Sequence, residues 1–578
     1  MSKEKKNLEV YRHTLSHILM QALEELYGAI PGVGPAIENG FYHDFDCAYQ
    51  VNKSDFPKIE KKMQEIIKKN FPIQKKVLSI EEGKKLLKDK GYKYTLELAQ
   101  DLQNDGHKKI TFYQQGDFIN MCQGPHLSST GKINLKSFKL VKVSGVYWRG
   151  DENNKMIQRI YGIAFLTPQE LRQYEEMLKE AQKRDHRKIG KEMDLFSFHE
   201  EGPGFVFWHP KGTVLYNELE NFIREENFKR NYSEVKTPLV LNKKLWVTSG
   251  HWDKFKEDMY FTKIDQEDYA IKPMNCPGGL LIYKNRPHSY RELPIRNAEF
   301  GLVHRHELSG VLHGLFRVRS FTQDDAHSFC SPEQLENEIM DMVDYALDVY
   351  SRFGFKEYEI FIATRPQKYI GSLKEWSRAT LALEKALKKK KLKYKIKDGE
   401  GAFYGPKIEF NIKDSLGRNW QCGTIQVDFS MPKRFEAVYT DKDGKKKIPV
   451  MVHRAILGSL ERFLGILIEH YAGAFPLWLS PIQIKIISVG DKHVKYCQKL
   501  TAEFQENKLR VEADLSDETV GNKMRKAIQE KIPYILVIGD KEIESGLLAV
   551  RQRKTKQTQL IEKSKFIKQV LRDIKKKV

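Results

Sequence analysis

The segment from Gly301 to Cys330 holds a dense set of side chains that can bind charge or exchange protons. On an extended backbone, alternate side chains lie on the same face. Two stretches each keep one parity: Arg305 and Glu307 in the first, then Arg317, Arg319, Gln323, Asp325 and His327 in the second. Because buried charges need partners, such a face is a poor core face. The pattern predicts a strand–loop–strand whose polar face binds a phosphate-bearing substrate.

Three soft or borderline metal ligands, Cys276, His327 and His453, stand in separate parts of the middle of the chain. Each has polar neighbours, in KPMNCPGG, FTQDDAH and VHRAILGSLERF. Their spacing by itself is compatible with a shared zinc site and with ordinary structural roles.

A second set of ligand types lies near the N-terminus. His13 and His17 are four residues apart on a predicted helix, so they share one face. Far along the chain, Cys122 and His126 flank a Gly-Pro pair that rules out a regular helix between them. The residues alone are compatible with a tetrahedral zinc site or with unconnected helix and loop positions.

The elements that must position these residues fall into three domains. Apolar spacing predicts a helix over 8–27, and short strands with Gly- and Pro-containing turns follow to about residue 165. Residues 167–192 read as one charged connecting helix, opened by Thr167, Pro168 and Glu170. From 193 to about 475 the pattern predicts a mainly antiparallel sheet. After 476, strands at 482–489, 510–513 and 534–538 alternate with helices, which predicts an α/β domain.

Composition points to a soluble chain with an anionic partner. The formal charge is +21 over 578 residues, which favours a partner with a phosphate backbone. Six scattered cysteines are typical of reduced thiols in a cytosolic protein. The N-terminus lacks an apolar signal core, and the longest apolar runs are too short to span a bilayer. We expect a cytoplasmic protein without membrane segments.

Motifs along nearly the whole chain resemble those of the threonyl-tRNA synthetase family, which belongs to the class II aminoacyl-tRNA synthetases. They include YWRGDENNKMIQRIYGIAF, MDLFSFHEEGPGFVFWHPKG, SGHWDKF, GAFYGPKIEF, LGRNWQCGTIQVDF and HRAILGSLERF. The resemblance implies an α+β editing domain at 1–166, a linker helix at 167–192, a class II catalytic domain at 193–475 and an α/β anticodon-binding domain at 476–578. It also implies ATP-dependent ligation of L-threonine to threonine tRNA through a threonyl-adenylate, with hydrolysis of mischarged seryl-tRNA.

Carried over to this sequence, the resemblance assigns one zinc ion per subunit to Cys276, His327 and His453. A zinc that takes the amino group and hydroxyl of threonine would reject valine, which a hydrophobic pocket separates poorly. Asp325 is implied to receive the hydroxyl proton. The residues implied to complete the threonine pocket are Gln323, Tyr404 and Gln426.

The same resemblance implies an ATP site with Mg²⁺ as the counter-ion. Arg305 would face the α-phosphate, Glu307 the adenine amino group, and Arg462 the γ-phosphate. Arg317 and Gln421 would complete the site. His251, in SGHWDKF, matches a residue proposed to help the proton transfer when the terminal ribose hydroxyl attacks the adenylate.

For the N-terminal set, the resemblance implies the editing site, which works without its own metal. His13, His17, Cys122 and His126 would position a water and the substrate, with Tyr42 and Asp44 nearby. This chain has Asn120 where the family usually has an aspartate, and asparagine cannot act as a base.

Two further expectations concern partners. Asp517, Glu542 and Arg551 match residues that contact anticodon bases, and the region around NYSEVKTPLV would form a homodimer interface. The chain opens directly on the editing helix, so the ubiquitin-like domain that begins many family members is expected to be missing.

Two other functions are compatible with parts of the pattern. One is a class II enzyme for proline or serine, against which the zinc ligands and the HxxxH/CxxxH pair argue. The other is a synthetase-like RNA-binding regulator that has lost catalysis, which predicts that an arginine facing the α- or γ-phosphate is missing, whereas Arg305 and Arg462 are both present.

Overall fold

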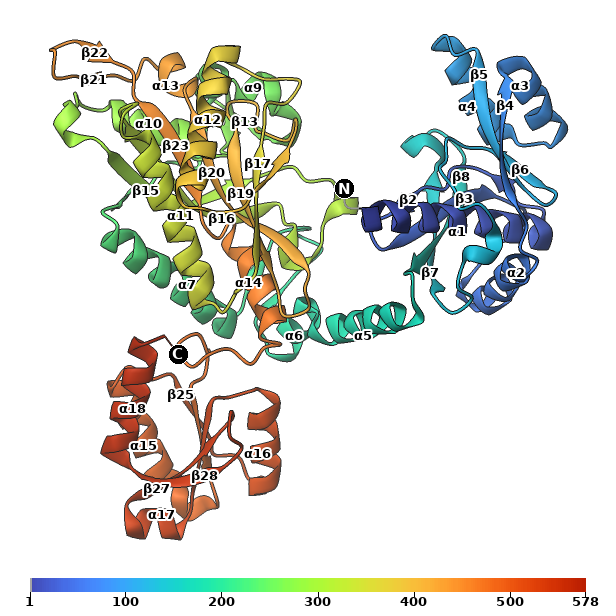
Figure 1. The fold of residues 1–578 in the computed structure, drawn as a ribbon. Coiled ribbons are helices and arrows are strands. Elements are labelled where there is room, and N and C mark those ends of the chain that lie inside the picture. Colours follow the sequence, from blue (N-terminus) through green and yellow to red (C-terminus); the bar gives the residue numbers. More distant parts are fainter. Residues whose placement is uncertain (1–2, 578) are drawn as a thin grey trace. The chain divides into compact units, whose positions relative to one another are not determined.

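The computed structural model describes residues 3–577, and Figure 1 shows their fold. Contacts divide the chain into two compact units, with the boundary between Lys179 and Glu180, inside helix α5 (Pro168–Arg184). No helix among the described residues is long and apolar enough to cross a membrane.

The first unit is built on a sheet with strand order β1–β3–β8–β7, in which β2 also pairs with β3. Helix α1 packs on this sheet through Leu15, Ile18, Leu19 and Leu23, whose helical spacing puts them on one fully buried face. The helix is longer than the predicted 8–27. The bounds are α1 (Lys3–Tyr27), β1 (Ile30–Pro31), β2 (Ala36–Ile37), β3 (Gly40–Asp46), β7 (Phe138–Tyr147) and β8 (Met156–Ala164).

A smaller antiparallel sheet of order β4–β5–β6 supplies the other side of the same unit. Its last strand ends one residue before Cys122, so the sheet delivers this cysteine toward α1. The bounds are α2 (Phe56–Lys68), β4 (Ile73–Ser79), α3 (Ile80–Asp89), α4 (Lys93–Asn104), β5 (Lys109–Gln115) and β6 (Phe118–Met121).

The predicted connecting helix at 167–192 is two helices, α5 and α6 (His186–Glu192), and the single-helix prediction is therefore wrong. Thr167 and Glu170 form the expected capping box at the start. The break falls at Asp185, whose Oδ1 accepts the Arg187 N–H at 2.8 Å and caps α6. No glycine or proline marks this break, so the sequence pattern missed it.

The second unit contains an eight-stranded sheet of order β11–β15–β16–β23–β20–β19–β17–β18. All its pairings are antiparallel except β11 with β15 and β17 with β18, which confirms the mainly antiparallel prediction. The strands are β11 (Ser233–Glu234), β15 (Ile295–His304), β16 (Ser320–Cys330), β17 (Tyr358–Ala363), β18 (Lys395–Lys397), β19 (Lys407–Lys413), β20 (Asn419–Asp428) and β23 (Val450–Ala455).

Four long helices pack against this sheet and share one large apolar core with it. They are α7 (Pro210–Lys229), α11 (Leu335–Arg352), α12 (Leu373–Lys389) and α14 (Leu460–His470). Smaller elements of this region are β9 (Phe196–Ser197), β10 (Phe207–Trp208), β12 (Val240–Asn242), α8 (Lys243–Ser249), α9 (His251–Lys254), β13 (Tyr260–Ile264), β14 (Glu267–Ile271), α10 (Cys276–Lys284), α13 (Met431–Arg434), β21 (Tyr439–Thr440) and β22 (Lys446–Lys447).

The C-terminal sheet has the order β25–β24–β26–β27–β28. Strand β24 pairs in parallel with β25 and β26, whereas the β26–β27 and β27–β28 pairings are antiparallel. The three predicted strands and both helices between them are present. The sequence pattern did not anticipate α17, β27, β28 or α18. The bounds are β24 (Ile484–Ser488), α15 (Val494–Glu506), β25 (Val511–Asp514), α16 (Val520–Gln529), β26 (Tyr534–Ile538), α17 (Asp540–Ser545), β27 (Leu547–Gln552), β28 (Thr558–Glu562) and α18 (Lys563–Lys575).

Candidate active sites

The antiparallel sheet brings the three predicted ligands of the central domain together. His327 on β16 lies directly opposite His453 on β23, with ring centroids 5.0 Å apart, and Cys276 opens α10 beside them. One ligand atom of each lies within 4.8 Å of the others, and all three side chains are buried. His327 Nε2 is buried without a hydrogen-bond partner among the described residues. Three convergent soft donors, one of them unpaired, suit a cation such as zinc.

Two carboxylates lie beside this cluster. Asp428 was not predicted to take part, and Asp325 was predicted only to bind threonine. Asp428 Oδ2 lies 3.3 Å from His453 Nε2, and Asp325 accepts a 3.1 Å hydrogen bond from Asn275 Nδ2. Burial raises the pKa of the Cys276 thiol, and the negative charges of Asp325 and Asp428 raise it further. Ionisation of this thiol therefore needs a cation beside it. Asp428 has the same parity as Gln426 on β20, and that alternation could have found it.

Tyr404 and Gln426, which were also predicted to bind the substrate threonine, border the same cluster. The Tyr404 ring lies 5.2 Å from the His453 ring, and Gln426 pairs across the sheet with His453. Gln426 Nε2 donates to the Gly405 carbonyl at 2.9 Å, which fixes the amide orientation. The structure thus places Tyr404 and Gln426 around His453, as a pocket wall would require.

A cavity of about 230 Å³ lies along the other end of β16, between β15, β20 and the start of α14. Its lining includes all five predicted ATP residues and Gln323: Arg305, Glu307, Arg317, Gln421, Arg462 and Gln323. Glu307 Oε2 accepts from Arg317 Nε at 2.9 Å, and Arg462 Nε donates to the Phe316 carbonyl at 3.0 Å. Three arginines around one polar hollow can bind a polyphosphate.

Arg319 does not join this face, although its parity predicts that it should. Strand β16 begins only at Ser320, and the Arg319 guanidinium donates to the carbonyls of Pro203 and Glu307. Asp324, on the opposite face from Gln323 and Asp325, was not predicted to matter. It accepts the N–H groups of Ile456, Leu457 and Gly458 at 2.8, 2.9 and 3.1 Å. It therefore anchors the turn that leads into α14 and Arg462.

His251 is buried at the start of α9 rather than exposed in a loop. Its Nδ1 lies 2.8 Å from Ser249 Oγ and its Nε2 lies 3.1 Å from Met274 Sδ. Burial, followed by the charges of His453 and Arg305, lowers the pKa of His251 to about 3. The imidazole is therefore neutral at physiological pH.

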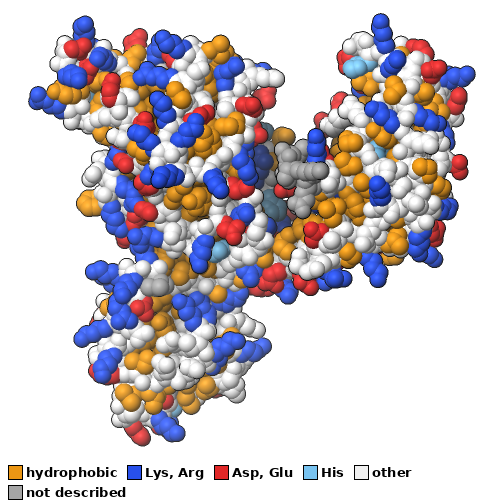
Figure 2. Space-filling model, in the orientation of Figure 1, with side chains coloured by type: hydrophobic (Ala, Val, Ile, Leu, Met, Phe, Trp, Pro, Cys, Tyr) orange, Lys and Arg blue, Asp and Glu red, His pale blue; other side chains and the backbone are white. Residues whose placement is uncertain are grey.

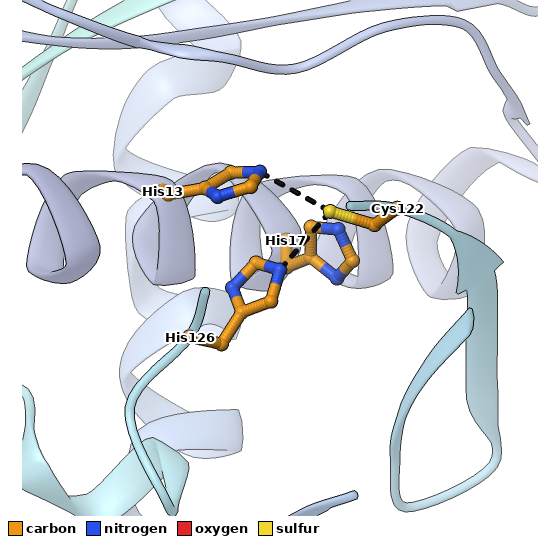
Figure 3. A group of neighbouring side chains, drawn as sticks. All are labelled: His13, His17, Cys122 and His126. Carbon is orange, nitrogen blue, oxygen red and sulfur yellow. Dashed lines mark hydrogen bonds between the residues drawn. The ribbon is translucent and has the colours of Figure 1, made fainter. Parts of the chain in front are cut away.

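The first unit holds a separate cavity of about 580 Å³, lined by His13, His17 and Cys122 among others. Figure 3 shows the two histidines projecting from α1 toward Cys122 and His126. Cys122 Sγ lies 3.3 Å from His13 Nε2 and 3.2 Å from His126 Nε2. The four ligand atoms lie within 4.8 Å of one another. The helix–loop pairing expected from the spacing is therefore a real spatial cluster.

Burial keeps this cluster uncharged. Desolvation lowers the pKa of His126 to about 3 and lowers the pKa values of His13 and His17 as well. It raises the pKa of Cys122 to about 11, so the sulfur is a thiol at neutral pH. Neutral imidazoles can accept or donate single hydrogen bonds, which suits the positioning of a water or a substrate hydroxyl.

Tyr42 and Asp44 do not line this cavity, and His43 does. Side chains alternate along β3, so Tyr42 and Asp44 share the face opposite His43. On that face Arg159 Nη2 donates to Asp44 Oδ2 at 2.8 Å and lies over the Tyr42 ring. His43 Nδ1 lies 3.0 Å from Ser16 Oγ, and its Nε2 is buried without a partner among the described residues.

Asn120 lines the same cavity and is buried. Its Oδ1 accepts the N–H of Met121 at 2.8 Å, so the amide stabilises the end of β6 rather than pointing a free acceptor inward. The cavity wall thus has an amide where a carboxylate would have supplied charge.

The three residues predicted to contact the anticodon lie in the C-terminal sheet domain, two of them beyond one end of the parallel strands and the third near the opposite end. Asp517 and Glu542 follow the carboxyl ends of β25 and β26, which are both parallel to β24 and therefore end at one edge. Glu542 also accepts the Gly539 N–H at the start of α17. Arg551 pairs with Ile535, near the other end of β26. In Figure 2, lysine and arginine side chains are spread over this domain and the rest of the visible face.

Three family models match separate parts of the chain. Residues 110–161 match the second additional domain of threonyl and alanyl tRNA synthetases, residues 260–471 the class II tRNA synthetase core domain (G, H, P, S and T), and residues 483–573 the anticodon binding domain. Each match falls on a region that the fold presents as a structural module.

Whole-chain relatives point the same way. A threonine–tRNA ligase of Acetivibrio thermocellus is 54% identical over 570 residues, covering 98% of this chain and 89% of the relative. One from Caldanaerobacter subterraneus subsp. tengcongensis is 53% identical, with 98% and 87% coverage. Among solved structures, the RNA binding domain of a threonyl-tRNA synthetase from Cryptosporidium parvum Iowa II matches with a TM-score of 0.65 and 40% identity, over 68% of this chain and 98% of that one.

Proposed function

The chain belongs to the threonine–tRNA ligase family, and from that premise we propose how its two cavities divide the work. The catalytic domain ligates L-threonine to threonine tRNA with ATP, and the first unit hydrolyses mischarged seryl-tRNA. The observation that carries the proposal is the convergence of Cys276, His327 and His453 next to the arginine-lined cavity.

We propose that Cys276, His327 and His453 hold one zinc ion, since their donor types and the unpaired His327 Nε2 fit that metal. When bound, zinc supplies Lewis-acid contacts to the amino and hydroxyl groups of threonine, and valine has no such hydroxyl. Asp325, held by Asn275, would accept the threonine hydroxyl proton in a hydrogen bond. Gln323, Tyr404 and Gln426 would close the pocket around the side chain.

In the first reaction step, a carboxylate oxygen of threonine attacks the α-phosphorus of ATP, and pyrophosphate leaves. Arg305 would offset the negative charge that grows on the α-phosphate, while Arg317 and Arg462 hold the β- and γ-phosphates together with Mg²⁺. Glu307 and Gln421 would orient the nucleotide. Cationic groups that are already fixed by packing need no reorganisation when the charge develops.

In the second step, a terminal ribose hydroxyl of the tRNA attacks the carbonyl carbon of the adenylate, and AMP leaves. We propose that His251 assists the transfer of the hydroxyl proton. With the ring proton on Nδ1, donated to Ser249 Oγ at 2.8 Å, the lone pair of His251 Nε2 faces Met274 Sδ, a contact that a substrate hydroxyl could replace. The bond from Nδ1 to Ser249 Oγ would keep the ring in place.

For editing, we propose that His13, His17, Cys122 and His126 position the water that attacks the seryl ester. The water oxygen bonds to the carbonyl carbon, and the tRNA hydroxyl leaves. Serine keeps the hydroxyl that the first site recognises and is smaller than threonine, so a second hydrolytic site is needed to remove it. The three histidines and the cysteine of this cluster are uncharged, which fits a water-positioning role that does not depend on a metal of their own.

The anticodon contacts and the homodimer are also proposals. Asp517, Glu542 and Arg551 would read bases, while the surrounding lysines supply non-specific affinity. In and beside the NYSEVKTPLV segment, Phe228 is 82% exposed, and Leu239 and Val240 are also exposed, as a self-complementary apolar interface requires. Light scattering should return a mass of about twice 67.5 kDa.

The main claim is tested by ATP–pyrophosphate exchange with threonine, proline and serine. We expect threonine-dependent exchange by the intact protein, and its loss together with one zinc per subunit in Cys276→Ala. Cys497→Ala removes another buried cysteine, far along the chain, and should keep both. No threonine-dependent exchange by the intact protein would refute the proposed activity.

Editing is tested with seryl-tRNA. Its hydrolysis should fall in His13→Ala, and it should persist after zinc is stripped with a chelator that abolishes threonine-dependent exchange. Unchanged hydrolysis in His13→Ala would refute the proposed site. Parallel loss of both activities on chelation would show that the first unit needs a metal too.

A further inference from the structure

A third cluster of titratable groups lies outside both cavities, where α6, α14 and the segment before β16 meet. His186 is fully buried there, and Asp185 and Glu469 lie next to it. His186 Nδ1 is 2.7 Å from Glu469 Oε1, and the Leu315 N–H donates to His186 Nε2 at 3.0 Å. These contacts join residues that are 283 and 129 positions apart in the chain.

The partners fix the tautomer of the ring. Because the Leu315 amide can only donate, His186 Nε2 must accept, and the ring proton therefore resides on Nδ1 and is donated to Glu469. Glu469 Oε1 also accepts the His186 backbone N–H at 3.0 Å, and its Oε2 lies 2.5 Å from Arg418 Nη2. With both ring nitrogens occupied, His186 has no lone pair to offer a metal ion.

The segment that His186 holds, 314–316, leads into Arg317 and accepts a hydrogen bond from Arg462, two of the arginines proposed to bind phosphate. The Phe316 ring lies 4.2 Å from the His186 ring and 4.3 Å from the Trp420 ring. The Phe316 carbonyl accepts from Arg462, and Arg317 follows directly. Gly314 has a positive φ, and a Cβ there would lie 2.2 Å from His186 Nε2, so any other residue would clash with the ring.

We propose that His186 is a positioning residue for the ATP cavity. It does not line the cavity, and it acts by holding the 314–316 backbone so that Arg317 and Arg462 face the polyphosphate. Glu469 accepts the Nδ1 proton and so fixes the tautomer of the ring. Arg418 forms an ion pair with Glu469, and Trp420 packs against the Phe316 ring. The inference rests on the proposed function only in taking this cavity to be the ATP site.

Two substitutions separate the two hydrogen bonds of the ring. His186→Asn places an amide nitrogen near the Nδ1 position, which preserves the bond to Glu469 and loses the acceptor for Leu315. His186→Gln places an amide oxygen near the Nε2 position, which restores that acceptor. In threonine-dependent exchange, we expect the KM for ATP to rise about tenfold in His186→Asn, the equivalent of one hydrogen bond. The rise in His186→Gln should be smaller.

A residue with a purely structural role would not raise the KM for ATP while leaving the other activities unchanged. The KM for threonine and the hydrolysis of seryl-tRNA should stay within about twofold of wild type, as expected when distant sites are independent. His288→Asn, another buried histidine of the same unit, should leave the KM for ATP unchanged. An unaltered KM for ATP in His186→Asn would overturn the inference, and so would equal rises in both substrates' KM. A metal ion bound in wild type and lost in both His186 variants would overturn it as well.

A wild-type protein without threonine-dependent exchange would instead refute the proposed function, so the two failures are distinguishable.

Discussion

At the scale of single residues, burial decides which groups in this protein carry charge. His251 and His126 have pKa values of about 3 and Cys122 about 11, each shifted mainly by desolvation. These side chains work as neutral hydrogen-bonding groups. The fixed positive charge of the proposed ATP cavity comes from arginines, which remain protonated even when partly buried.

Asp428 should matter nearly as much for zinc binding as the three proposed ligands, Cys276, His327 and His453. Its Oδ2 lies 3.3 Å from His453 Nε2, and carboxylate partners of this kind orient a ligating imidazole. Asp428→Asn is expected to weaken zinc binding by roughly 10- to 100-fold, as is typical of these partners. Competitive chelator titration measures it. Asp443→Asn, on a neighbouring hairpin, is the control, and equal zinc affinity in both variants would contradict the assignment.

His43 should make the first unit less stable in acid. Desolvation lowers its pKa to about 3 in the folded state, whereas the unfolded chain binds the proton near the usual pKa of roughly 6.5. Stability is therefore complete above that pH and is lost as the pH falls from there toward 3. Between pH 7.5 and 5.5 the loss should be about 1.4 kcal/mol.

Amide-exchange protection of β3 in the full chain measures this loss. His43→Gln cannot titrate and should lose about 1.4 kcal/mol less than wild type over the same pH interval. Identical pH dependence in the two proteins would exclude His43 as the cause.

At the scale of elements, strand alternation predicted the site where the backbone is extended and failed where it is not. Gln323, Asp325 and His327 lie on β16 and share a face, while Arg319 lies before the strand and binds elsewhere. Tyr42 and Asp44, predicted to lie near the cavity, are on the face of β3 opposite the cavity-lining His43. The contacts of His186 could not be predicted, because they join segments that only the complete fold brings together.

The break between α5 and α6 depends on the Asp185 cap. Asp185→Ala removes the acceptor for the Arg187 N–H and should lower the free energy of unfolding by about 1 kcal/mol. Asp185→Asn retains a capping oxygen and should lose less. Chemical denaturation of both variants measures the difference. Equal destabilisation would mean that the charge of Asp185, and not its cap, stabilises the junction.

At the scale of the whole molecule, the excess of 21 positive charges should dominate affinity for tRNA. Binding that releases condensed counterions weakens linearly with the logarithm of salt concentration. Raising monovalent salt from 50 to 200 mM should increase the Kd for tRNA by at least about tenfold, measured by filter binding. The KM for threonine, a small zwitterion, is the control and should change little. A salt-independent Kd would mean that charge contributes little to binding.

Strand β16 has one more consequence, which concerns how this enzyme can change over time. Asp324 faces the turn before α14, while Gln323 lines the cavity between β15, β20 and α14 and Asp325 shares its parity. Inserting or deleting one residue in the strand would exchange these faces and place the core residues in the cleft. Substitutions can therefore retune this site one side chain at a time. A one-residue length change in β16 would need a β-bulge to restore these faces, so we expect natural variation in chain length to concentrate in the loops around it.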